Sequence, residues 1–169
     1  MRKDHVDFVI RQWAEVRPDL DVSPMAVIGR LVRARSIFSS QLQPVFTRYD
    51  LNSGEFDVLA TLLRSNKPYT LPPNRLLQAL MLSSGAMTNR IDKLESKQLV
   101  ERKSDPSDRR GVLVSLTDKG YNLINEAVIT HINNGRKLLQ CLDPQEQEAL
   151  AALLRKILLE YESANQSLD

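Results

Sequence analysis

Residues 83–120 decide the fold, and they read SSGAMTNRIDKLESKQLVERKSDPSDRRGVLVSLTDKG. Apolar side chains recur at helical spacing over residues 84–98, which predicts a helix with one packed face. Residues 99–103 and 112–116 have the apolar and β-branched composition of strands. The polar, turn-rich residues 104–111 between these strands predict a hairpin with a long loop at its tip.

Helices are predicted on both sides of this stretch. Upstream, apolar spacing and capping residues predict helices at Asp4 to Val16, about Ser23 to Tyr49 with a kink at Pro44, from Asn52 onward, and from the Pro72-Pro73 pair to Leu80, with a short strand at residues 69–71. Downstream, Thr117 caps a long helix, and Asp143-Pro144-Gln145-Glu146 is a strong start for a last one. The outer helices carry apolar stripes too wide for one thin lobe to bury, so we expect a second copy of the chain to cover them.

The composition sets wide limits on function. The chain has 169 residues, with 23 Lys and Arg against 21 Asp and Glu, and a net charge of +2 does not by itself indicate nucleic acid. Any positive charge that serves DNA must therefore be concentrated locally. The single cysteine excludes an intramolecular disulfide, and no apolar run approaches the roughly 20 residues that span a bilayer, so we expect a cytoplasmic protein.

Signatures of catalysis and of metal binding are missing from the sequence. The six glycines do not cluster into a phosphate-binding loop, and no nucleophile elbow or His/Cys pair is present. His5 and His131 have no acidic or cysteine neighbours at metal-ligand spacing. We therefore predict no enzymatic activity, no metal and no cofactor. Cys141 is interpreted as a small packing or surface residue, with a redox-sensitive thiol as the alternative.

The predicted helix at residues 84–98 has an apolar face and a polar face. The polar face carries short hydrogen-bonding and charged side chains, namely Thr88, Asn89, Asp92, Lys93 and Ser96. Such a face suits the major groove of DNA. Ser83 and Ser84 stand at the helix N-terminus, where free N–H groups and the helix dipole favour a phosphate. Taken alone, the pattern is equally compatible with a capped and solvated surface helix.

The hairpin adds positive charge directly after that helix. Its arginines, on a mobile loop, could reach a minor groove or clamp phosphates. A solvated hairpin tip is the alternative, but the preceding pair of helices makes DNA binding the preferred interpretation. The predicted DNA-binding residues are Ser83, Ser84, Thr88, Asn89, Lys93, Arg102, Arg109 and Arg110.

Three segments in this order resemble the MarR family of bacterial regulators: IDKLESKQLVER at 91–102, DPSDRR at 105–110 and LTDKG at 116–120. The resemblance covers nearly the whole chain. It implies a recognition helix and a wing in a homodimer joined by its N- and C-terminal helices, with one recognition helix in each half of a pseudo-palindrome. It also implies that Arg109 or Arg110 is the wing arginine and that Asp108 braces the wing. Many relatives carry a basic residue where Asn89 stands, so base preference is not carried over.

Three further residues suggest a ligand site. Trp13, the sole tryptophan, lies in an extra N-terminal helix, and Asp57 and Arg90 flank the packed faces of their helices, where they could pair. From spacing alone, structural edge charges and a tryptophan in a dimer core are the simpler interpretation. Together with Arg17-Pro18-Asp19-Leu20, these residues resemble the PecS-type, urate-responsive branch of the family. That resemblance implies that Trp13, Asp57 and Arg90 form a pocket for a small aromatic or anionic effector.

These observations predict a mainly α fold with a small β-hairpin, a winged helix-turn-helix flanked by dimerisation helices. Residues 1–49 would form N-terminal helices for dimerisation and the lid of the ligand pocket, 50–117 the DNA-binding domain, and 118–169 the C-terminal dimerisation helices. The predicted function is sequence-specific transcriptional regulation, as a repressor of a pseudo-palindromic operator that a urate-like ligand or phenolic acid relieves. The alternatives are a ligand-independent DNA-binding regulator and a helical protein-interaction module.

Overall fold

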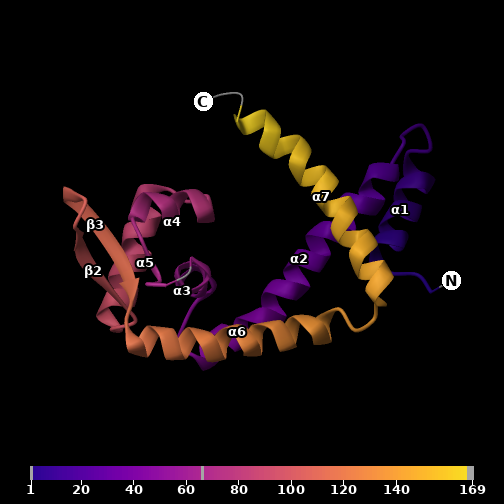
Figure 1. Cartoon of the computed structure of the whole chain (residues 1–169). Coiled ribbons are helices and arrows are strands. Elements are labelled where there is room, and N and C mark those ends of the chain that lie inside the picture. The colour runs from indigo at the N-terminus through magenta and orange to yellow at the C-terminus, as the bar shows by residue number, and fades with distance from the viewer. Residues whose placement is uncertain (1, 66, 167–169) are drawn as a thin grey trace. The chain divides into compact units, whose positions relative to one another are not determined.

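The computed structural model describes residues 2–65 and 67–166, and within them the side chains of all but Arg109 and residues 163–166. The chain forms two compact units, Met1–Ile129 and Thr130–Asp169. The elements run in the order α1 His5–Val16, α2 Ser23–Arg48, α3 Ser53–Arg64, β1 Thr70–Leu71, α4 Pro73–Leu80, α5 Ser84–Ser96, β2 Val100–Asp105, β3 Asp108–Leu116, α6 Asp118–Leu138 and α7 Pro144–Gln166 (Figure 1). The prediction of a mainly α winged-helix fold is confirmed.

The sheet of the first unit has three antiparallel strands in the order β1-β3-β2. Strands β2 and β3 form the hairpin that we call the wing, residues 100–116, and its register pairs Val100 with Leu116 and Lys103 with Leu113. The short strand β1 pairs Thr70 with Ser115, and this pairing adds a third strand to the predicted hairpin. Figure 1 shows the wing extending beyond helices α4 and α5 at one side of this unit.

The wing tip is shorter than predicted. The strands continue to Asp105 and Asp108, so Pro106 and Ser107 alone form the turn. The Asp105 carboxylate accepts hydrogen bonds from the hydroxyl of Ser107 at 2.6 Å and from its N–H at 2.8 Å, and these bonds lower the pKa of Asp105. The predicted long loop is wrong because these polar side chains close the turn locally, which composition alone does not reveal.

Capping explains where most helices begin. The side chains of Asn52 and Glu55 each accept a hydrogen bond from the other residue's N–H, at 2.9 and 3.0 Å, which is a capping box at the start of α3. The N-cap predicted at Ser23 is wrong by one position, because the N-cap residue of α2 is Val22. The carboxylate of Asp21 accepts bonds from the N–H and the hydroxyl of Ser23, and Ser23 already lies inside the first turn of α2.

An apolar core joins α3, α4, α5, the sheet and the start of α6. Its largest members have almost no exposed surface, and they are Val58, Leu59, Leu62, Leu76, Met87, Ile91, Leu94, Val100, Val114 and Ile124. Three of them, Met87, Ile91 and Leu94, follow one another at helical spacing along α5. Their burial fixes which face of α5 turns outward, and that face positions the site.

The second unit contains the end of α6 and the helix α7. The predicted start of α7 is confirmed, since Asp143 and Glu146 form a capping box with both hydrogen bonds at 2.9 Å. Several apolar side chains of α7 are exposed, namely Leu150, Leu153, Ile157, Leu158, Leu159 and Tyr161. Among the described residues, every helix is too short or too polar to cross a membrane.

Candidate nucleic-acid interface

Helices α4 and α5 form the helix-turn-helix. Helix α4 ends at Leu80. Its C-cap residue Met81 has a left-handed φ of 50° that turns the chain, and α5 starts three residues after Met81, at Ser84. Helix α5 ends at Ser96, two residues before the predicted end, because Gln98 also takes a left-handed φ, of 60°. The core side chains of α5 occupy its inner face, so its polar residues are presented to solvent as the sequence predicts.

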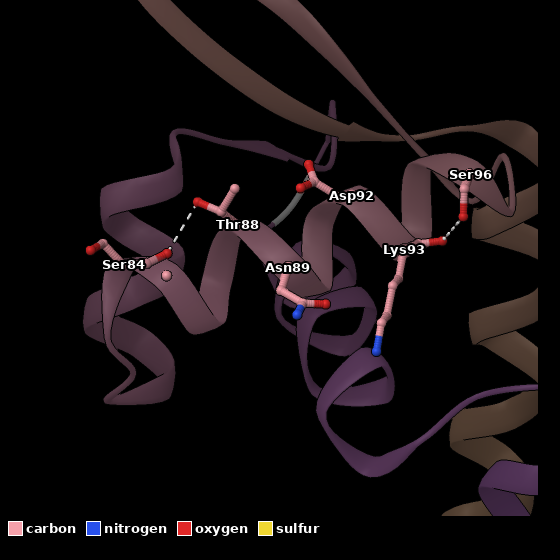
Figure 2. Close-up of a pocket in the computed structure, with 7 residues that line it drawn as sticks. Ser84, Thr88, Asn89, Asp92, Lys93 and Ser96 are labelled. Carbon is pink, nitrogen blue, oxygen red and sulfur yellow. Dashed lines mark hydrogen bonds between the residues drawn. The ribbon is translucent and has the colours of Figure 1, made fainter.

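The outer face of α5 borders an open hollow of about 630 Å³. The hollow is lined by Ser84, Gly85, Thr88, Asn89, Asp92, Lys93 and Ser96 (Figure 2). Figure 2 shows the amide of Asn89 and the ammonium group of Lys93 projecting to the same side, away from Asp92. This arrangement offers a hydrogen-bonding amide and a positive charge together, as contact with a DNA groove requires.

Two of the outer hydroxyls bind their own helix. Thr88 donates to the carbonyl of Ser84 at 3.1 Å, and Ser96 donates to the carbonyl of Lys93 at 2.8 Å. The Thr88 oxygen can therefore accept a hydrogen bond from a ligand, and its methyl group stays exposed. Among the outer residues, Asn89 is the side chain best placed to donate and accept at once.

The N-terminus of α5 is open to an anion. Ser83 is the N-cap residue with an extended φ of −75° and ψ of 155°, and within the described chain its side chain caps no backbone N–H. Both Ser83 and Ser84 are exposed. The first-turn N–H groups therefore face solvent at the positive end of the helix dipole, where a phosphate oxygen could bind.

Arg102 of the wing is turned toward α5. Its guanidinium donates to the carboxylates of Asp92, at 2.5 Å, and of Glu95. The hydrogen bond to Asp92 is the main cause that raises the pKa of Arg102. The side chain predicted to contact DNA thus ties β2 to α5 and neutralises two acids close to the hollow.

Replacing Arg102 by alanine should weaken operator binding about fivefold, since two unpaired carboxylates would face DNA at a cost of about 1 kcal/mol. Adding Glu95→Gln to the same chain should restore part of the loss. The measurement is a binding titration at several salt concentrations. If the slope of log affinity against log salt concentration instead becomes shallower by about 0.9 for each Arg102 removed, Arg102 contacts a phosphate directly.

The remaining wing cations lie nearer the tip. Lys103 is exposed and pairs with Glu101 at 2.7 Å. Arg110 is exposed, and its N–H donates to the Asp108 carboxylate at 2.9 Å, a bond within the start of β3. Arg109 lies in β3, and its side chain falls outside the described residues.

Two cations hold α5 on α3, and the sequence prediction missed this role for one of them. Lys97 donates to the buried carboxylate of Glu55 at 3.1 Å and also to the carbonyl of Asp50. Arg90 donates to the carbonyl of Gly54 at 3.5 Å. The sequence identifies Glu55 as a capping residue, but it does not show that Glu55 is buried. The role of Lys97 as the partner of a buried carboxylate was therefore predictable only in part.

The three predicted ligand residues lie on three helices. Arg90 is half-buried on α5 beside α3, where Asp57 follows Gly54 by one turn and is exposed. Trp13 lies on α1 with 39% of its surface exposed. The hollow of about 300 Å³ beside it is lined, within the described residues, by Val9, Gln12, Trp13 and Val16 of α1 alone. The structure thus brings Arg90 and Asp57 to neighbouring helices and leaves Trp13 on a separate surface of α1.

Comparisons with known proteins agree with this geometry. The MarR family model matches residues 51–112. The HTH-type transcriptional regulator PecS of Dickeya dadantii is 41% identical over 152 residues, which cover 90% of this chain and 92% of PecS. These matches confirm the predicted resemblance.

Two solved structures share the fold. A mutant MarR from E. coli complexed with operator DNA aligns with a TM-score of 0.69 and 28% identity, over 86% of this chain and 97% of that one. Bordetella bronchiseptica BpsR, whose DNA binding is regulated by 6-hydroxynicotinic acid, aligns with a TM-score of 0.69 and 28% identity, over 78% and 91%. This chain is therefore a member of the MarR family of winged helix-turn-helix, DNA-binding transcriptional regulators, and is not an enzyme.

Proposed function

We propose that the chain acts as a homodimeric repressor of a pseudo-palindromic operator and that a small aromatic or anionic ligand relieves the repression. The observation that carries this proposal is the outer face of α5, where Asn89 and Lys93 border an open hollow beside the wing. Buried side chains on the opposite face hold this surface outward. One such helix fits one half-site, and a two-fold axis supplies the other, roughly 34 Å away.

Exposed apolar side chains support the homodimer. On α1 and α2 these side chains include Phe8, Val27, Ile28, Val32, Ile37 and Phe38, and α7 carries its own series. An apolar groove of about 440 Å³ also lies between α1 and α2. Surfaces of this kind mark protein interfaces. We assign dimerisation to residues 1–49 and 118–169, and DNA binding to 50–117.

The predicted DNA contacts have chemical roles in this proposal, apart from Arg102, whose guanidinium binds Asp92 and Glu95. The backbone at Ser83 and Ser84 binds a phosphate. Asn89, with help from Thr88, reads a base edge, and asparagine pairs bidentately with adenine. Lys93 and the wing arginines Arg109 and Arg110 bind the backbone or enter a minor groove.

The ligand part of the proposal rests on Arg90, Asp57 and Trp13. The half-buried guanidinium of Arg90, on the helix next to Asp57, can exchange its carbonyl partner on Gly54 for an anionic ligand, and the exposed indole ring of Trp13 can stack on a planar one. The regulation of BpsR by an aromatic acid supports the same ligand class. The ligand acts only through its preference for the DNA-incompetent state, and a coupling of about 1–3 kcal/mol would change affinity about 5- to 150-fold.

Selection of bound DNA from a random pool tests the whole proposal. We expect a palindromic site with half-sites roughly 34 Å apart, bound by a species of twice the chain mass. Urate or a phenolic acid should release that site and quench the fluorescence of Trp13, and Arg90→Ala should respond less. A monomer, or equal weak binding to all duplexes, would refute the operator model, while selective binding without any ligand response would leave a ligand-independent regulator.

A further inference from the structure

The guanidinium of Arg90 lies directly on the backbone of Gly54. A β-carbon at position 54 would stand 2.5 Å from Cζ and 2.6 Å from Nε of Arg90, well inside contact distance. The φ angle of Gly54 is not positive, so its backbone conformation would accept any residue. The space above Gly54 is therefore occupied by the guanidinium of Arg90 from α5, and a β-carbon at position 54 would displace it.

Two other helical glycines have no such neighbour, and at Gly120 the close neighbour is backbone and not a side chain. At Gly85 and Gly135, a β-carbon would meet no described atom within 4 Å. A glycine inside a helix costs stability relative to alanine, and at these two positions alanine would fit. Gly54 differs because its missing side chain gives Arg90 a place to lie.

The two cations that join α5 to α3 differ in the strength of their bonds. Lys97 binds the carboxylate of Glu55, which is 3% exposed, in a charge-assisted bond. Arg90 binds a neutral carbonyl, that of Gly54, at the long distance of 3.5 Å. The two residues are seven positions apart, two helical turns along one face. An incoming anion would therefore draw Arg90 away from its carbonyl partner more readily than Lys97 from Glu55, and α5 would stay bound to α3 through Lys97.

We propose that Gly54 is a positioning residue, the seat that holds Arg90 and thereby sets the DNA-binding pose of α5. Removal of Arg90 from this seat is the step by which an anionic ligand weakens DNA binding. The second statement rests on the proposed function of Arg90 in ligand binding. The first concerns the protein without ligand and stands independently.

Gly54→Ala tests the seat without removing any charge. The clash falls on the far end of a flexible side chain, so the domain should fold, and the better helix former should keep or raise the melting temperature. Operator affinity without ligand should fall about 5- to 150-fold. The mass of Gly54→Ala in solution should equal that of the wild type, so a fall in affinity would not come from lost chain association.

A double-mutant cycle shows whether Gly54 acts through Arg90. In an Arg90→Ala background, Gly54→Ala should cause no further loss of operator affinity. Arg90→Lys keeps the charge but lacks the planar guanidinium, so it should also lose affinity, and it serves if Gly54→Ala fails to fold. The proposal would be overturned if Gly54→Ala bound the operator with wild-type affinity, or if it lost the same affinity with and without Arg90. If Gly54→Ala does not fold and Arg90→Lys is used in its place, wild-type affinity of Arg90→Lys would overturn the proposal as well.

Urate is the probe for the ligand step. Gly54→Ala should show a smaller loss of operator affinity on urate addition than the wild type, because its Arg90 is already displaced. A full wild-type response in Gly54→Ala would contradict the release step. If the wild type itself ignores urate, the proposed ligand class fails, whereas the double-mutant cycle still decides whether Gly54 seats Arg90.

Discussion

Replacing Arg109 and Arg110 together by alanine should lower operator affinity on the order of 100-fold at physiological salt, through lost phosphate contacts. In a homodimer the change removes four cations. If all four bind phosphates, the slope of log affinity against log salt should become shallower by about 3.6. The loss should be similar for operator and for unrelated duplexes, because backbone contacts carry no sequence information.

Titrations at several salt concentrations measure both quantities, and Lys103→Ala offers a matched control. Lys103 lies on the same wing but already pairs with Glu101, so its removal should change the slope much less. An unchanged slope in the Arg109 and Arg110 double variant would mean that the wing does not reach the DNA. A loss confined to the operator would assign the wing a base-reading role instead.

Gly120→Ala should destabilise the DNA-binding unit by about 3 kcal/mol, with a fall in melting temperature of about 6–12 °C. A β-carbon at position 120 would stand 1.9 Å from the carbonyl oxygen of Leu99. That oxygen also accepts the N–H of Thr117, so the clash falls on backbone that is already bonded and cannot turn aside. The start of α6 would have to move away from β2.

Gly85→Ala is the control for that substitution. Like Gly120, Gly85 lies in the first turn of its helix, but a β-carbon there meets no described atom within 4 Å. The melting temperature should therefore fall in Gly120→Ala, whereas that of Gly85→Ala should equal or exceed the melting temperature of the wild type. Equal melting temperatures for Gly120→Ala and the wild type would show that α6 can shift without cost.

Local sequence rules succeeded where neighbours in the chain decide the structure. The Asn52–Glu55 capping box and the apolar spacing of Met87, Ile91 and Leu94 were sufficient to place α3 and α5 and to orient the polar face of α5. They failed at the wing tip, where the side chain of Asp105 closes a turn that composition predicts as a long loop.

The sequence by itself determined the order of the helices and strands, the outward face of the recognition helix and the cationic character of the wing, because periodicity, caps and charge are local. Only the tertiary structure decided that Arg102 binds Asp92 and Glu95, that Lys97 reaches the buried Glu55, and that Arg90 rests on Gly54. Each of these contacts joins residues on different elements, and the last two span about forty positions of the chain. Such contacts depend on how the elements pack around the common core, which no spacing rule encodes.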